Sequence, residues 1–130
     1  MNLLKYLQIT QGQFHSKMFT ACGKLPAEPD LAQLMELVES KEFSGNADDY
    51  LDSNGSSLLM YCIGPANAHS EAMVDFLLEN GASATHRNTN GQSAMGYINA
   101  WKKSKPNEYY GPLVEKLRAL GCNPHETPAF

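Results

Sequence analysis

Two short segments of this 130-residue chain decide its fold: Asp52-Ser53-Asn54-Gly55 and Asn88-Thr89-Asn90-Gly91. They lie 36 residues apart, and each is preceded, ten residues before its final glycine, by another glycine, Gly45 or Gly81. A third copy of the pattern begins at Gly121. Repetition with a period of roughly 20 to 50 residues is typical of stacked supersecondary units, none of which buries its apolar face alone. The sequence therefore predicts a repeat protein with a long open surface, as binding proteins have.

Apolar residues at helical spacing predict a pair of helices in each unit. The clearest helix covers 30–40, where Leu34 and Leu37 fall on one apolar stripe. Ser57 stands where a helix needs an N-cap, since its hydroxyl can accept a hydrogen bond from a backbone N–H of the first turn. Gly81 is expected to end a helix in a left-handed turn. The predicted helices cover 13–22, 30–40, 58–63, 69–80, 92–101 and 110–120.

These elements predict one all-α domain, 1–130. Two extended, hairpin-like fingers, 45–55 and 82–91, precede helix pairs, because Asn and Gly tolerate positive φ in tight turns. The final residues contain two prolines and little apolar periodicity, so we expect a loosely held tail. The predicted parts are an N-terminal capping helix (1–12), a first repeat (13–44), a second repeat (45–80), a third repeat with an insertion between its helices (81–122) and the tail (123–130).

Composition limits the classes of partner. The formal net charge of -4 opposes general binding to nucleic acid, whose affinity depends on neutralising phosphates. The longest apolar run, Leu58 to Ile63, is far shorter than the roughly 20 residues of a membrane-spanning helix. The three cysteines lack CxxC spacing, and the first residues lack the pattern of a signal peptide. We expect a cytoplasmic protein, monomeric on its own, that binds neither nucleic acid nor membrane.

The middle unit carries a family pattern. Gly55-x-Ser57-x-Leu59 follows an Asx-containing turn and leads to a helix that ends in Val74-x-x-Leu77-Leu78-x-x-Gly81-Ala82. This pattern resembles the ankyrin repeat, over about residues 13–125. The family's Thr-Pro-Leu-His tetrapeptide is replaced here by Ser57-Leu58-Leu59-Met60 and by Ser93-Ala94-Met95-Gly96. The resemblance implies an all-α, ankyrin-repeat-like solenoid of stacked helix pairs with hairpin-like finger loops, and a non-enzymatic scaffold that binds other proteins.

The resemblance also implies which residues meet a partner, because the family binds with its finger tips and the adjoining face of its first helices. The positions that match are Leu51, Ser53, Asn54 and Ser56 in one repeat and Arg87, Thr89, Asn90 and Gln92 in the next. Residue types alone add four more, since exposed aromatic side chains beside charges are favoured at the centre of interfaces. These four are Asp48, Asp49, Tyr50 and Trp101.

Three acidic residues in one loop, Asp48, Asp49 and Asp52, raise the question of a calcium site. A calcium loop needs oxygen ligands at alternate positions before its glycine and a glutamate six residues after it. Tyr50 and Tyr61 occupy the first and the last of those positions. The sequence therefore favours a solvated turn or an acidic tip that faces a partner, and it predicts no metal and no cofactor.

Two other groups allow a functional and a structural interpretation. Cys62 and His69 could pair through space as a nucleophile and its base, but Cys62 stands where ankyrin repeats have a small buried alanine, and buried apolar cysteines react poorly. The basic run Lys102–Lys105 is flanked by Trp101 and Tyr109-Tyr110, an arrangement found in proteins that bind single strands of nucleic acid. Three lysines in an acidic chain favour a solvated or protein-contacting loop instead.

The sequence supports three functional hypotheses. The first is a small inhibitor or immunity-type protein that binds and blocks a partner, for which the acidic charge suggests a basic toxin or enzyme. The second is a structural adaptor or regulatory subunit that bridges two proteins. The third is a hydrolase or metal enzyme with a site near Cys62 and His69, for which the chain carries no motif.

Overall fold

The structure is a computed structural model that describes residues 3–24, 27–63, 68–107 and 110–130, with side chains described within 12–24, 27–63, 71–107 and 110–130. Six α-helices and one 3-10 turn account for its regular structure, and the described residues include no β-strand. This confirms the all-α prediction. The elements are α1 (Leu3–Ala21), α2 (Leu31–Glu39), η1 (Ala47–Asp49), α3 (Leu58–Cys62), α4 (Ala68–Glu79), α5 (Ala94–Ser104) and α6 (Gly111–Ala119).

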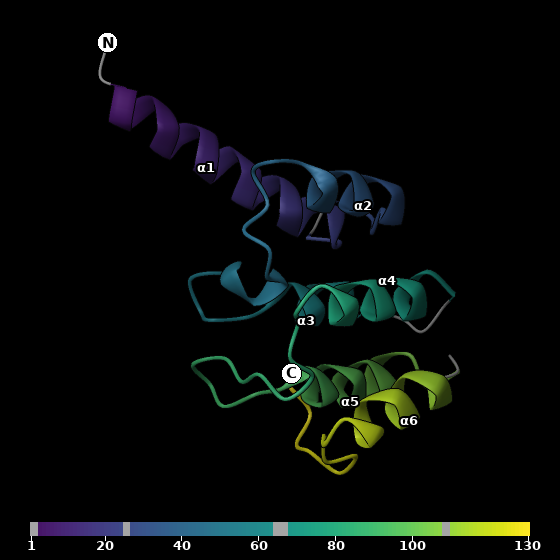
Figure 1. Cartoon of the computed structure of the whole chain (residues 1–130). Coiled ribbons are helices and arrows are strands. Elements are labelled where there is room, and N and C mark those ends of the chain that lie inside the picture. Colours follow the sequence, from purple (N-terminus) through teal and green to yellow (C-terminus); the bar gives the residue numbers. More distant parts are fainter. Residues whose placement is uncertain (1–2, 25–26, 64–67, 108–109) are drawn as a thin grey trace.

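The helices pack in three successive pairs, α1 with α2, α3 with α4, and α5 with α6. Figure 1 shows these pairs one above another, with the loops that precede α3 and α5 extending beyond the helices on one side. Neighbouring pairs touch through α1 and α3, through α2 and α4, and through α3 and α5. Each pair therefore covers the apolar face of the next, as the 36-residue period requires.

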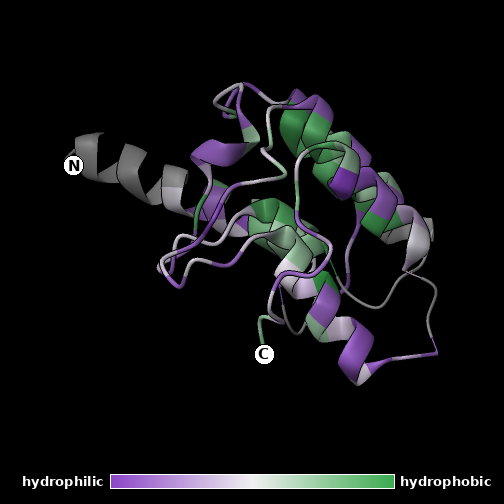
Figure 2. Ribbon diagram, turned by 90° about the horizontal axis from the view of Figure 1, so that it is seen from below, coloured by the Kyte–Doolittle hydropathy of each residue, from purple (hydrophilic) through white to green (hydrophobic). Residues whose placement is uncertain are grey.

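One hydrophobic core runs through all three pairs. Figure 2 shows hydrophobic residues gathered along the helices and hydrophilic ones along much of the loops. Because the side chains at these contacts are almost entirely apolar, their burial supplies the main driving force for stacking the pairs. The largest fully buried side chains are Met18, Leu34, Leu58, Leu59, Met73, Leu77, Met95, Ile98 and Leu117.

Local signals fix several helix ends. Asp30 caps α2, accepting a 3.1 Å hydrogen bond from the backbone N–H of Gln33. Ser57 caps α3 as predicted, with its hydroxyl accepting from the N–H of Met60 at 3.3 Å. Gly81 follows α4 at φ +99°, a left-handed conformation that other residues rarely adopt. The predictions for Ser57 and Gly81 are confirmed, whereas the cap at Asp30 was not predicted from the sequence.

The N-terminal helix differs from the sequence-based expectation. Residues 1–12 and 13–22 are predicted as separate helices, yet α1 continues from Leu3 to Ala21 through Gly12. A single helix-interior glycine costs only about 1 kcal/mol relative to alanine, so it does not break a helix that packing holds in place. In Figure 1 the first turns of α1 extend beyond the stacked pairs.

The C-terminal segment 123–130 was predicted to be a loosely held tail, and this prediction is wrong. The backbone N–H of Ala129 donates to the carbonyl of Gly96 at 2.9 Å, and the side chain of Asn99 donates to the carbonyl of Glu126 at 2.8 Å. Residues 123–130 therefore lie along α5, the last helix pair's inner helix. Proline in this segment limits regular structure, but it does not prevent an extended chain from binding a neighbouring helix.

Candidate protein-binding surface

The two fingers have the same turn geometry. In the first, Oδ1 of Asp52 accepts hydrogen bonds from the backbone N–H groups two and four residues further on, at 2.8 and 2.9 Å. In the second, Oδ1 of Asn88 accepts from the equivalent two N–H groups, at 3.0 and 3.1 Å. These are Asx turns, in which a short polar side chain holds its own backbone in place. The sequence repeat is thus a repeat in hydrogen bonding as well.

The fingers are also bonded to each other. The carbonyl of Asn54 accepts from the N–H of Thr89 at 2.9 Å and from its hydroxyl at 3.0 Å. A ring nitrogen of His86 lies 2.8 Å from the carbonyl oxygen of Gly55. Backbone carbonyls accept these links, and the side chains that take part are those of Thr89 and His86, so the side chains of Ser53, Asn54 and Asn90 are not used to hold the tips in register. Four predicted contact residues are exposed at the linked tips: Ser53, Asn54, Thr89 and Asn90.

Two of the predicted contact residues are buried, so the prediction that they are exposed on the binding surface is wrong. Tyr50 is buried, its hydroxyl accepts from the N–H of Ser44 at 3.0 Å, and its ring packs against Phe14 and Phe43. Ser56 is also buried, with its hydroxyl accepting from the side chain of Asn88 at 3.3 Å. Tyr50 belongs to an aromatic cluster that closes the first repeat, and Ser56 belongs to the contact between fingers.

The remaining predicted residues beside the first finger have mixed positions. Asp49 is exposed and Leu51 is half-buried, forming an isolated antiparallel bridge with Ser57. Asp48 is half-buried, and its Oδ2 accepts from the N–H of Ser83 at 2.8 Å, so this side chain holds the start of the second finger. Its Oδ1 is buried without a hydrogen-bond partner within the described residues.

The other three predicted residues lie towards the tail. Gln92 is half-buried and donates to the carbonyl of Ala129 at 2.9 Å. Arg87 is exposed at the second finger and forms an ion pair with Glu126 at 3.1 Å. Trp101 is half-buried, and its indole N–H donates to the carbonyl of Ile63 at 3.1 Å. Each of these residues therefore has an intramolecular role. Arg87 and Gln92 also bond within the second finger, to the carbonyl of Gly91 and to the side chain of Asn88.

A pair of tyrosines was missed by the sequence analysis. The hydroxyl of Tyr61 donates to Oδ2 of Asp52 at 2.7 Å, and the hydroxyl of Tyr97 accepts from the side chain of Asn88 at 3.2 Å. Each tyrosine stands on the first helix of its pair and ties that helix to the finger before it. Their separation of 36 residues, equal to the period of the repeat, is the signal that could have identified them.

The distribution of charge was also missed. Residues 28–79 contain eleven of the fourteen acidic residues and only one basic residue, Lys41. Residues 80–130 contain six basic residues and three acidic ones. The middle of the chain is therefore strongly negative although the total charge is small. Eight of its carboxylates are exposed: Glu28, Asp30, Glu36, Glu39, Glu42, Asp49, Asp75 and Glu79.

The cysteines are packing residues in this structure. Cys22, Cys62 and Cys122 are unpaired and buried. Burial raises the pKa of Cys22 to about 12 and holds that of Cys62 well above its usual range. A thiol in such an environment is a poor nucleophile at neutral pH. The side chain of His69, the proposed partner of Cys62, lies outside the described residues, among which no group of three or more acidic, histidine or cysteine side chains could hold a metal ion.

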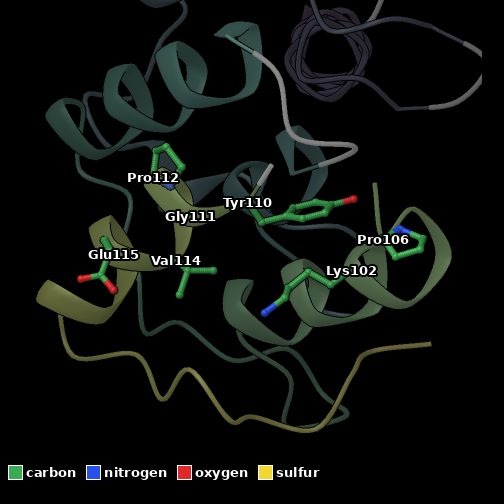
Figure 3. A pocket seen from close by; sticks show the side chains of 7 residues that line it. All are labelled: Lys102, Pro106, Tyr110, Gly111, Pro112, Val114 and Glu115. Atoms are coloured by element: carbon green, nitrogen blue, oxygen red, sulfur yellow. The ribbon is translucent and has the colours of Figure 1, made fainter. Parts of the chain in front are cut away.

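The basic run ends α5 and borders an open hollow of about 700 Å³ between α5 and α6. Lys102, Lys103 and Lys105 are exposed, whereas Tyr110 is buried with its hydroxyl within 3.1 Å of the carbonyls of Trp101 and Lys105. Tyr110 thus closes the last helix pair, and Tyr109 lies outside the described residues. Figure 3 shows the residues that line the hollow: Lys102, Pro106, Tyr110, Gly111, Pro112, Val114 and Glu115.

Comparison of the chain with protein-family models, with curated proteins and with solved structures found no match. Among the described residues, no helix is both long and apolar enough to cross a membrane.

Proposed function

We propose that this protein is a non-enzymatic protein-binding module with an ankyrin-like arrangement of helix pairs, and that its linked finger tips contact the partner. The main observation behind the proposal is the link between the two fingers, in which the carbonyl of Asn54 accepts hydrogen bonds from the backbone N–H and the hydroxyl of Thr89. Tips fixed to each other lose little conformational entropy when a partner binds. Their exposed ends, Ser53 and Asn90 among them, are left available for recognition.

The charge distribution supports a basic partner. An excess of negative charge over residues 28–79 would attract a positively charged protein and speed its association. A small acidic module that occupies a basic toxin or enzyme would act as an inhibitor or immunity-type protein. Such a complex should form with one-to-one stoichiometry, and its association rate should fall as salt screens the charges.

The roles of the chemically reactive side chains support binding over catalysis. Cys62 is buried with a raised pKa, and its thiol donates to the carbonyl of Leu59 at 3.1 Å. The carboxylate of Asp52 is occupied by two backbone N–H groups and the hydroxyl of Tyr61. A hydrolase or metal enzyme would need such groups to face a substrate instead of the chain's own backbone.

Site-specific photo-crosslinking tests the proposal. A benzophenone amino acid is placed at Asn54 or Asn90 on the tips, or at Ala119 on α6 as a control, since all three residues are exposed. We expect crosslinking from both tip positions to the same protein in native extract, with one-to-one stoichiometry, and none to it from Ala119. Crosslinking to that protein only from Ala119 would contradict the proposed surface.

Charge substitution in the purified complex provides the quantitative test. Asn54→Arg with Asn90→Arg adds two positive charges at the tips, and Gln33→Arg with Ala119→Arg adds the same charge at exposed positions elsewhere. We expect the tip pair to weaken binding at least about tenfold more than the control pair, since changes at an interface centre cost far more than changes outside it. Equal effects would indicate general electrostatics without contact at the tips.

An adaptor remains a second candidate, because the hollow in Figure 3 offers another surface. Figure 1 places the ends of α5 and α6 that border it on the opposite side of the helix pairs from the fingers. A photo-crosslinker at exposed Asn107, close in sequence to Pro106 of the hollow, separates the candidates. An adaptor predicts a second protein crosslinked from Asn107 while the first remains bound at the tips, whereas an inhibitor predicts one partner only.

A further inference from the structure

The tail binds α5 in the manner of an extended peptide. Three groups of the domain form hydrogen bonds with the backbone of the tail: the side chains of Asn99 and Gln92 and the carbonyl of Gly96. Asn99 donates to the carbonyls of Pro124 and Glu126 at 3.2 and 2.8 Å, and Gln92 donates to the carbonyl of Ala129 at 2.9 Å. The N–H of Ala129 donates to the carbonyl of Gly96 at 2.9 Å. Recognition of main-chain groups by amide side chains is a common way of holding an extended segment.

A carboxylate anchors the middle of the tail. Oε2 of Glu126 accepts from the backbone N–H of Ser93 at 2.9 Å, and both of its oxygens accept from the Ser93 hydroxyl at 2.8 and 2.9 Å. Arg87 adds an ion pair at 3.1 Å, and only 11% of the Glu126 side chain is exposed. Ser93 precedes α5, so the carboxylate also lies at the positive end of that helix. The domain thus provides a specific receptor for one acidic side chain.

Gly96 lies directly beneath the Glu126 carboxylate and leaves room for it. It lies inside α5, where glycine is less favourable than alanine. A Cβ atom at this position would lie 2.7 Å from Oε2 of Glu126 and 3.2 Å from the carbonyl oxygen of Thr127. The glycine therefore leaves the space that the tail's carboxylate and backbone occupy, which explains an otherwise costly residue in the helix.

An aromatic residue ends the tail on two aromatic side chains of α5. The ring of Phe130 meets the ring of Trp101 edge-on at 5.7 Å and that of Tyr97 at 6.4 Å. Phe130 nevertheless remains 62% exposed. Beyond buried Cys122, every tail residue is half-buried or exposed, so the segment is held by polar anchors and an aromatic rim without entering the core.

We propose that α5 and the second finger form a peptide-binding site, distinct from the finger tips, which recognises a partner segment with a carboxylate side chain and an aromatic residue four positions later. In the structure the chain's own tail occupies this site. A partner segment of the same chemistry displaces the tail and takes its place on Arg87, Ser93 and Gly96. The site is independent of the proposed function at the finger tips.

The covalent link to the domain makes the tail a strong competitor. A tethered segment acts at an effective concentration in the millimolar range, so a separate peptide binds the intact protein with correspondingly reduced apparent affinity. A partner segment therefore displaces the tail only when its own local concentration is also high, for example when the partner is already bound elsewhere on the protein. Weakening the tail's anchors should remove this competition.

The experiment uses the 130-residue chain and a synthetic peptide with the sequence of residues 123–130, and binding is measured by the fluorescence of Trp101, the one tryptophan in this sequence. The Glu126→Gln/Phe130→Ala variant of this chain should bind the peptide at least about tenfold more tightly than the wild type, since its tail lacks the charged anchor and the aromatic ring of Phe130. Replacing glutamate by glutamine in the peptide should weaken its binding about tenfold. Adding Gly96→Ala to the protein variant should abolish binding.

Hydrogen exchange at the Ala129 amide reports independently on the tail. Faster exchange in the Glu126→Gln/Phe130→Ala variant, with unchanged exchange in the buried parts of α3 and α4, is the expected result. Two results would overturn the proposal. The first is a folded variant whose tail is released but which does not bind the peptide. The second is an Ala129 amide that stays protected in the variant. Formation of a dimer by exchange of tails would also overturn it, because the occupant would then be a second copy of the chain.

Discussion

The hydroxyl of Tyr61 donates a 2.7 Å hydrogen bond to Oδ2 of Asp52 and so ties the first turn of α3 to the tip of the first finger. The other oxygen of this carboxylate holds the turn itself through two backbone N–H groups. In the next repeat Asn88 and Tyr97 meet in the same way, with the amide as donor and the hydroxyl as acceptor. The two copies thus preserve one geometry while reversing the direction of one hydrogen bond.

Substitution of Asp52 should separate the two functions of its side chain. Asp52→Ala leaves two backbone donors and the Tyr61 hydroxyl without their acceptor, so we expect the free energy of unfolding to fall by about 2 kcal/mol. Asp52→Asn should cost less than about 1 kcal/mol, because Asn88 fills the equivalent position and an amide can donate to the tyrosine hydroxyl. Urea denaturation measures both values, and equal losses would contradict the geometry described for the two repeats.

Stability should fall in acid because two carboxylates are held ionised. Burial acts to raise the pKa of Asp52, but hydrogen bonds from Tyr61 and two backbone N–H groups outweigh it, so the pKa lies below its ordinary value of 3.8. In Glu126 burial is likewise outweighed, by hydrogen bonds from Ser93 and the charge of Arg87, and the pKa lies below 4.5.

A lowered pKa means that the folded state binds fewer protons than the unfolded state near these values. The contribution of each carboxylate to stability is then complete above its ordinary pKa and is lost as the pH falls through the lowered one. We expect the free energy of unfolding to decrease steadily below about pH 4.5, and less steeply in Asp52→Asn and Glu126→Gln. Urea titrations between pH 7 and pH 3 test this, and parallel curves for all three proteins would contradict it.

Local signals explain what the sequence predicted correctly. The stripe through Leu34 and Leu37, the cap at Ser57 and the left-handed turn at Gly81 each depend on residues within one turn of the feature. The 36-residue repeat then placed these local elements in stacked pairs. Periodicity, capping and turn chemistry act over a few residues, so one sequence is sufficient to read them.

Apart from the helix break expected near Gly12, the errors involve contacts between distant parts of the chain. Tyr50 was expected at the surface beside two aspartates, but the ring of Phe14 on α1 covers it. The tail was expected to be loose, yet Glu126 reaches Ser93, 33 residues earlier in the chain. No short-range pattern reports such contacts. For the same reason the sequence grouped Trp101 with the finger tips, whereas the structure bonds its indole N–H to the carbonyl of Ile63.

The buried thiols should react slowly in the folded protein. Burial raises the pKa of Cys22 to about 12, and burial together with the charge of Glu126 raises that of Cys122. Because the thiolate is the reactive form, we expect modification by an aromatic disulfide at pH 8 to be at least roughly a hundredfold slower in the native state than in urea. All three cysteines should react in urea. A thiol that reacts at the same rate in both states would be exposed, in conflict with the structure.

Two helix-interior glycines should respond to alanine with opposite signs. At Gly12 in α1 a Cβ atom would meet no described heavy atom within 4 Å beyond its chain neighbours and its own helix backbone. Gly12→Ala should therefore raise the free energy of unfolding by about 0.5 to 1 kcal/mol through helix propensity alone. Gly96 in α5 has the same intrinsic preference for alanine, but its Cβ would overlap Oε2 of Glu126 and approach the Thr127 carbonyl at 3.2 Å. That carboxylate is fixed by Ser93, so it cannot move away without losing its hydrogen bonds.

We therefore expect Gly96→Ala to lower the free energy of unfolding by about 1 to 2 kcal/mol, with a change in Trp101 fluorescence as the ring of Phe130 moves away from it. Urea denaturation of both variants gives the comparison, and stabilisation by both would mean that the tail does not need the space above Gly96.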